Sequence, residues 1–359
     1  MESPAGGRVF VPPAEVTERA PRDGGGMKIN ERAVRAGAAW TAVAATVPYL
    51  TLKLLWLAGI SVGADNAREL DKLWVPNLLS FGMDAIAFAL ALTFVRPWGW
   101  RVPAGLVAFP MWVATGLLGT LLVELPIYLL AFLVLGPEHT TQQDPGFAGL
   151  SGWVSPLVYG GFTVQGLSLF TAFLLYARRR WAALLHERIG ELPDSPTLTA
   201  QRSLACAAAL LATGVATARV YWAAGGAAGL PPSMHDDGSR GPATLDSVVA
   251  MMVVAAPTAL LVLVFRLRPR RRLLWPLLVA WTGAGSLLGW GSWLLIMFGT
   301  TSTKVPDLHH AVPGLLPLVE CVQVVTGLLI LVVGALALTE RGVLAKQGAL
   351  TERGCRRVA

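Results

Sequence analysis

The sequence predicts an all-α membrane protein, a polytopic transmembrane helix bundle of about eight spans. Of its 359 residues, 54% are hydrophobic and only 14% are charged, which lies outside the range of ordinary soluble domains. Apolar runs of about 20 residues recur between short polar breaks, and each can cross a hydrocarbon core of about 30 Å as a helix. We therefore expect lipid to surround most of the chain.

The third apolar run differs from the others in length. Its 33 residues would make a helix of about 50 Å, too long for one straight crossing. We expect Pro126, which follows Glu124 and Leu125, to break it and leave a tilted or interfacial piece. The expected spans are residues 37–60, 74–95, 103–135, 153–177, 203–224, 244–265, 274–298 and 313–338.

Positive charge predicts the orientation, because Lys and Arg of short loops stay on the cytoplasmic side. From Lys28 onward, 20 lysines and arginines lie before the first span, after the last span or in alternate loops. The loops on the opposite side hold only four: Arg68, Lys72, Arg240 and Lys304. This alternation requires an even number of spans and places both termini in the cytoplasm of a cell-membrane protein.

Polar segments divide the remainder of the chain. Residues 1–36 are rich in proline, glycine and charge, and we expect a disordered cytoplasmic tail, with Met27 as an alternative start. Residues 181–202 form a cytoplasmic linker whose beginning suits an interfacial helix beside anionic lipid, although an ordinary juxtamembrane anchor explains it equally well. Residues 342–359 form a basic cytoplasmic tail.

Self-comparison indicates an internal duplication. Thr51–Gly59 (TLKLLWLAG) and Thr217–Gly225 (TARVYWAAG) share threonine, a basic residue, tryptophan and glycine at an offset of 166. Weaker matches occur at offsets of 171 and 161 in other spans. We expect two parallel four-helix repeats, residues 37–180 and 203–341, related by an axis along the membrane normal. The alternative is that helices rich in Leu, Ala and Gly align by composition alone.

Charged residues inside the spans are the candidate functional site. A charge at the bilayer centre costs about 2.5–3.5 kcal/mol on insertion scales, so such residues face protein, water or a partner. The candidates for binding a substrate or ion in the outer half of the membrane are Lys53, Asp84, Glu124, Arg219 and Glu320. The alternatives are that the two cations snorkel to the headgroups, or that the charges only join helices.

Other signals point away from soluble chemistry. The net charge of +7 comes from residues beside the membrane, which argues against nucleic-acid binding. There is no Walker A loop, nucleophile elbow or zincin motif, so an enzyme is the less favoured class. The spread of the histidines and cysteines predicts no metal site, and no cofactor is expected. Gly285-x-x-x-Gly289 indicates close helix packing, either within the bundle or between protomers.

The Lys/Arg–aromatic–Trp–small–Gly pattern of Thr51–Gly59 and Thr217–Gly225 resembles one found in uncharacterised multi-pass membrane proteins of high-GC Gram-positive bacteria. The resemblance implies a membrane location and no particular activity.

Three functions remain open from the sequence. A secondary transporter would need a water-filled cavity that reaches Asp84. A non-catalytic membrane component, such as a sensor, an assembly factor or the partner of another membrane protein, would have a dry, filled bundle. A membrane enzyme acting on lipid-linked substrates would need carboxylates or histidines that converge at one interface, and it is the least favoured. The lipid bilayer is the expected partner, with a homo-oligomer or another membrane protein as further alternatives.

Overall fold

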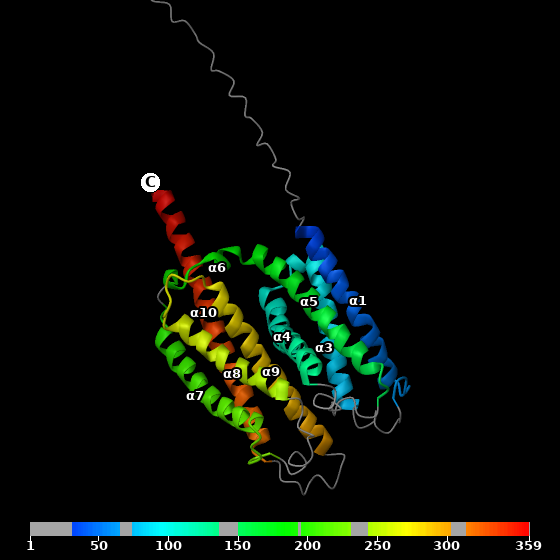
Figure 1. The fold of residues 1–359 in the computed structure, drawn as a ribbon. Coiled ribbons are helices and arrows are strands. Elements are labelled where there is room, and N and C mark those ends of the chain that lie inside the picture. Colours follow the sequence, from blue (N-terminus) through cyan, green and yellow to red (C-terminus); the bar gives the residue numbers. More distant parts are fainter. Residues whose placement is uncertain are drawn as a thin grey trace, which may run out of the picture.

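The computed structural model describes residues 31–64, 74–135, 150–192, 195–230, 243–302 and 314–358, and these ranges are helical almost throughout (Figure 1). Within them lie eight helices of 22 or more residues. The first four are α1 (Glu31–Leu57), α3 (Trp74–Val95), α4 (Ala104–Leu135) and α5 (Val154–Arg180). The other four are α7 (Leu198–Ala223), α8 (Ala243–Val264), α9 (Leu274–Ser302) and α10 (Leu316–Val358). The short elements are η1 (Pro97–Trp100), α6 (Ala182–His186) and η4 (Ile189–Glu191).

Seven of the long helices are apolar enough, over a sufficient length, to cross a membrane, counted over the described residues. The chain is therefore a polytopic helical membrane protein, as predicted. The eighth long helix, α9, is not among the seven, and it packs on α4, α8 and α10. Its stretch from Gly283 to Leu287 is buried without interruption. Other residues of α9, such as Trp275 and Val279, are exposed on the outside of the bundle.

The expected break in the third span is wrong. Helix α4 runs without interruption from Ala104 to Leu135 and contains both Pro110 and Pro126. Proline removes one backbone donor, but a full break in an apolar surrounding would leave several more backbone groups without partners. Continuing the helix through the proline therefore costs less free energy than breaking it.

Two other helix bounds differ from the expected spans. Helix α1 begins at Glu31, inside the segment expected as a tail, and α10 continues through Val358.

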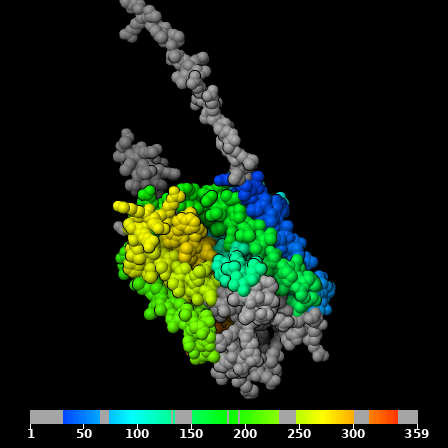
Figure 2. Space-filling model, in the orientation of Figure 1, coloured from blue at the N-terminus to red at the C-terminus, as the bar shows by residue number. Residues whose placement is uncertain are grey.

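The helices form two groups of four that meet along α4 and α9. In the first group, α1 packs against α3 and α5; in the second, α7 packs against α8 and α10. Figure 1 shows the blue to green helices of the first group beside the green to red helices of the second, with α4 and α9 between them. In Figure 2 the turquoise end of α4 reaches the surface between the yellow atoms of the second group and the green atoms of α5.

Side-chain size and burial follow the pattern of a protein in lipid. Small residues fill the interior of both groups, including Ala39 and Ala42 of α1 and Ala205 and Ala208 of α7, each at most 1% exposed. Large apolar residues cover the outside, with Leu210 of α7 75% exposed. In water this arrangement would be unfavourable, but lipid tails solvate such side chains, while small residues let helices approach closely.

The arginine-rich segments meet at one end of the bundle. Arg179 at the end of α5 pairs with Glu31 at the start of α1, with Nη2 and Oε2 3.1 Å apart. The α8–α9 turn joins the segment after α6 through the amide of Leu273, which donates to the carbonyl of Glu187 at 2.9 Å. At the opposite end, the Ser151 amide donates to the carbonyl of Gly63 at 2.8 Å.

The turns that follow α1 and α7 have the same construction. Gly59 and Gly225 both adopt positive φ, 81° and 98°, where a side chain would be strained. The indole of Trp56 donates to the carbonyl of Val62 at 2.8 Å, six residues later. The indole of Trp222 donates in the same way to the carbonyl of Ala228 at 3.0 Å. These are the two segments that the sequence comparison aligned at an offset of 166.

Candidate functional site: two buried ion pairs

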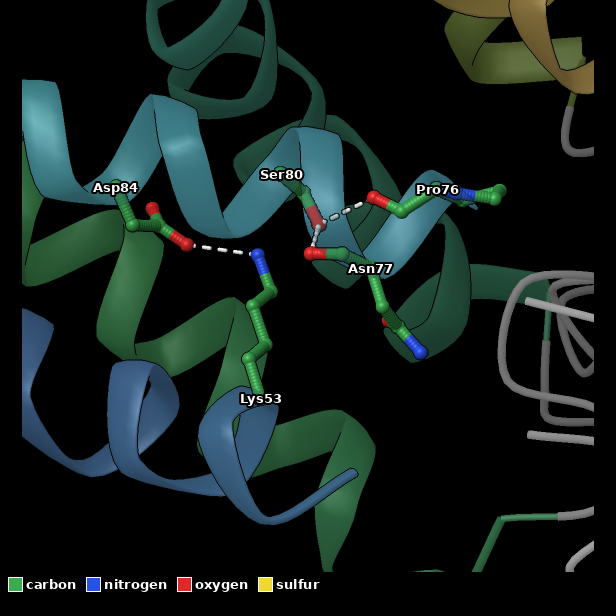
Figure 3. A network of polar contacts seen from close by, with 5 residues as sticks. All are labelled: Lys53, Pro76, Asn77, Ser80 and Asp84. Carbon is green, nitrogen blue, oxygen red and sulfur yellow. Dashed lines mark hydrogen bonds and ion pairs between the residues drawn. The ribbon is translucent and has the colours of Figure 1, made fainter. Parts of the chain in front are cut away.

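The first ion pair joins α1 to α3. The ammonium of Lys53 donates to Oδ2 of Asp84 at 2.7 Å (Figure 3), and the two residues are 0% and 6% exposed. The same ammonium lies 3.8 Å from the centre of the Tyr49 ring, one turn earlier on α1, in a cation–π contact. Gln165 of α5, also buried, lies beside the Asp84 carboxylate. Three helices therefore meet at this pair.

Helix geometry explains why Lys53 and Asp84 need each other. Asp84 lies ten residues after Trp74, about 15 Å along α3, so its short side chain cannot reach the end of the helix. Lys53 lies four residues before the end of α1, and its side chain points toward Asp84 (Figure 3). Ser80 takes no part in the ion pair, because its hydroxyl donates to the carbonyl of Pro76 at 2.7 Å.

The second ion pair joins α7 to α10. Nη2 of Arg219 donates to Oε1 of Glu320 at 2.6 Å, and the two residues are 2% and 0% exposed. Nε of Arg219 donates to the amide oxygen of Gln323 at 3.1 Å. Gln323 in turn donates to the carbonyl of Leu287 on α9 at 3.3 Å. Here too a buried cation binds a carboxylate, and an amide side chain links the pair to a third helix.

The two pairs share the position of the cation and differ in the source of the acid. Lys53 and Arg219 both lie four residues before the end of the first helix of their group. The carboxylate for Lys53 comes from the second helix, α3, whereas the carboxylate for Arg219 comes from the fourth, α10. Both pairs lie toward the end of the bundle opposite the arginine-rich segments.

The five predicted site residues thus occupy three places. Four of them form two separate ion pairs, one in each group of helices. Glu124 lies half-buried on α4.

Two hollows among the described residues lie away from both pairs. A hollow of ≈ 500 Å³ lies on the outside of α8 and α9, lined by residues such as Met251 and Val279. A smaller one of ≈ 180 Å³ lies between α3, α4 and α9, lined by residues such as Met83, Leu117 and Ser292. Their linings are almost entirely apolar and include none of the five candidate residues.

The contact between the two groups uses small residues and hydroxyls. The hydroxyls of Thr120 on α4 and Ser286 on α9 are 2.7 Å apart. Gly116 faces Gly285 so closely that an added Cβ on Gly116 would lie 2.0 Å from the carbonyl carbon of Gly285. Gly289 likewise faces Leu117 of α4. The expected close packing at Gly285 and Gly289 is therefore confirmed, and it occurs within the bundle.

Sequence analysis missed the uncharged residues that complete the pairs. Tyr49 precedes Lys53 by four residues and Gln323 follows Glu320 by three, so each shares a helix face with its charged neighbour. That spacing was a usable signal. Gln165 carried no such signal, because it comes from another helix. His139, His235, His309 and His310 lie outside the described residues.

Comparison of the chain with family models, with curated proteins and with solved structures found no match. What the protein does must therefore be argued from its own residues.

Proposed function

We propose that this chain is a non-catalytic component of the cell membrane, in which the two buried ion pairs join helices and carry no substrate. The observation that supports this most directly is the burial of both pairs: none of Lys53, Asp84, Arg219 and Glu320 is more than 6% exposed. A transported ion or solute would need a path to these groups. A filled bundle is what a sensor, an assembly factor or the membrane partner of another protein would have.

The energetics of buried charges fit this role. The attraction between two buried charges offsets their loss of hydration only when the pair has close geometry and other polar groups bind the remaining donors and acceptors. Tyr49 and Gln165 contribute such contacts to the first pair, and Gln323 accepts a hydrogen bond from Arg219 of the second. Such a pair disfavours any packing that separates its helices, so it specifies which helices are neighbours.

The internal duplication is part of the proposal, and three observations support it. The turns after Trp56 and Trp222 match bond for bond, as described above. The buried faces of α1 and α7 also coincide at the same offset of 166. Finally, Thr120 bonds Ser286, its own equivalent at that offset. A pseudo-two-fold axis between α4 and α9 brings equivalent residues of the two repeats into contact with each other.

We further propose eight spans with both termini in the cytoplasm. The arginine-rich segments gather at one end of the bundle, and the positive-inside rule makes that end cytoplasmic. The assignment of α9 as a span rests on its 29 residues and on its position between α8 and α10. An epitope tag in the Arg266–Arg272 turn should react only in permeabilised cells. A tag that reacts in intact cells would exclude this topology.

Cysteine accessibility tests the dry bundle without knowledge of any substrate. In a chain whose three native cysteines are replaced by serine, Ser286→Cys places a thiol at the contact between the two groups. A membrane-impermeant maleimide should fail to label it from either side of the membrane. Ser61→Cys, in the exposed turn after α1, is the matched control and should be labelled from outside. Labelling of Ser286→Cys from either side would refute a static bundle.

Transport is the second candidate, and the arrangement of the pairs favours it in one respect. Each ion pair lies within one group of four helices, so the two groups could rock as rigid bodies about α4 and α9. The small residues and hydroxyls of that contact would allow such motion. Labelling of Ser286→Cys from both sides would support this candidate over the static component.

A further inference from the structure

The cytoplasmic end of the first helix group contains an arginine whose hydrogen-bonding capacity is not used. Nε and Nη1 of Arg35 on α1 are buried and have no acceptor among the described residues. The guanidinium carbon lies 5.2 Å from the centre of the Trp100 ring, so the aromatic face fixes its orientation. Buried donor atoms without an acceptor are costly, although the Arg35 side chain as a whole is only partly buried.

The neighbours of Arg35 add positive charge and provide no carboxylate. Arg32 and Arg179 are close enough to repel it. Glu31 binds Arg179 at 3.1 Å and is half-exposed. Arg180 donates to the backbone carbonyl of Val102 at 2.9 Å and to the hydroxyl of Tyr176. The acceptor for Arg35 must therefore come from outside the described residues.

In the second helix group, the residue equivalent to Arg35 has hydrogen-bond acceptors within the chain. At the offset of 166, Gln201 occupies the place of Arg35, and at the offset of 161, Glu340 occupies the place of Arg179. The amide nitrogen of Gln201 lies 3.1 Å from the hydroxyl of Ser195 and 3.4 Å from Oε2 of Glu340. Where the second group has a carboxylate and a neutral amide, the first has two cations.

We propose that this arginine cluster, Arg32, Arg35 and Arg179 over Trp100, binds a phosphate group, supplied by an anionic lipid of the cytoplasmic leaflet. The planar fork of a guanidinium matches the spacing of two phosphate oxygens, and the bond is charge-assisted. The site lies at the start of α1 and the end of α5, the depth at which headgroups meet the helices if this end is cytoplasmic. The inference uses the proposed orientation and is independent of the role of the ion pairs.

The test measures binding to the purified full-length protein by its thermal stabilisation. Three probes are added in detergent: phosphatidylglycerol, phosphatidylcholine and inorganic phosphate. Phosphatidylglycerol should raise the melting temperature in a saturable manner, and phosphatidylcholine should not. Stabilisation by inorganic phosphate alone, at similar concentration, would identify a free phosphate compound as the ligand and overturn the lipid assignment.

Variants connect the effect to this site. Arg35→Gln, which copies the second group, should raise the half-saturating concentration of phosphatidylglycerol on the order of tenfold or more. Arg179→Glu, which places a carboxylate beside Arg35 as Glu340 lies beside Gln201, should abolish the effect while the protein stays folded. Arg202→Gln is the matched control, because Arg202 is exposed at the same end and also stacks on an aromatic ring, that of Phe265.

The outcomes separate clearly. Equal affinity in the wild type, Arg35→Gln and Arg202→Gln would refute the site. If Arg35→Gln fails to fold, Arg179→Glu still decides, because retention of lipid stabilisation in that variant would refute it. An outward location of the Arg266–Arg272 tag would refute the topology and, with it, the cytoplasmic leaflet as the source of the lipid, whereas the binding results alone decide whether the arginine cluster binds phosphate.

Discussion

Removal of the Asp84 carboxylate is the sharpest test of what the ion pairs do. At 2.7 Å and an effective dielectric constant of about 20, the attraction between Lys53 and Asp84 is about 6 kcal/mol. Asp84→Asn removes that attraction and leaves the Lys53 charge buried. Losing one partner of a buried pair costs about 3–5 kcal/mol. The cation–π contact with Tyr49 remains and should keep the cost toward the lower end of this range.

Replacement of both partners should behave differently from replacement of one. Lys53→Met with Asp84→Leu removes both charges and keeps the volume, so we expect stability within about 1 kcal/mol of the wild type. Glu31→Gln is the matched control, since it breaks the exposed pair with Arg179, and it should cost no more than about 1 kcal/mol. The assay is the melting temperature of purified protein, with the monodisperse fraction after heating as a second readout.

Two results would refute this reasoning. If Asp84→Asn is no less stable than Glu31→Gln, the pair does not hold the helices together. If Asp84→Asn is stable and the double variant is severely destabilised, the residues matter for their shape and hydrogen bonds, and their charge is incidental.

Two further predictions concern the packing of the groups and their equivalence. Gly116→Ala should cost about 1–3 kcal/mol or more, because the new methyl would overlap the backbone of Gly285; Gly82→Ala, with open space at its Cβ, should be neutral or stabilising in the same thermal assay. Trp56→Phe and Trp222→Phe should each lower stability by about 1 kcal/mol, because each removes one buried indole hydrogen bond of the same geometry, and clearly unequal losses would argue against equivalent turns.

The sequence by itself determined the solvent of this protein and the positions of its buried cations. Hydrophobicity over windows of about 20 residues is a local property, so the helical membrane class could be predicted from composition and spacing alone. Lys53 and Arg219 stood out because each interrupts an apolar run, and their shared motif placed them at equivalent points of two helices.

Only the tertiary structure decided which acid pairs with which cation. The sequence assigned each of Asp84, Glu124 and Glu320 a depth in its own helix, but it did not say which cation each would meet. Rotation of each helix about its axis and the choice of its neighbours bring Asp84 of α3 to Lys53 and Glu320 of α10 to Arg219. These choices depend on contacts between residues 31 and 101 positions apart, which no local pattern records.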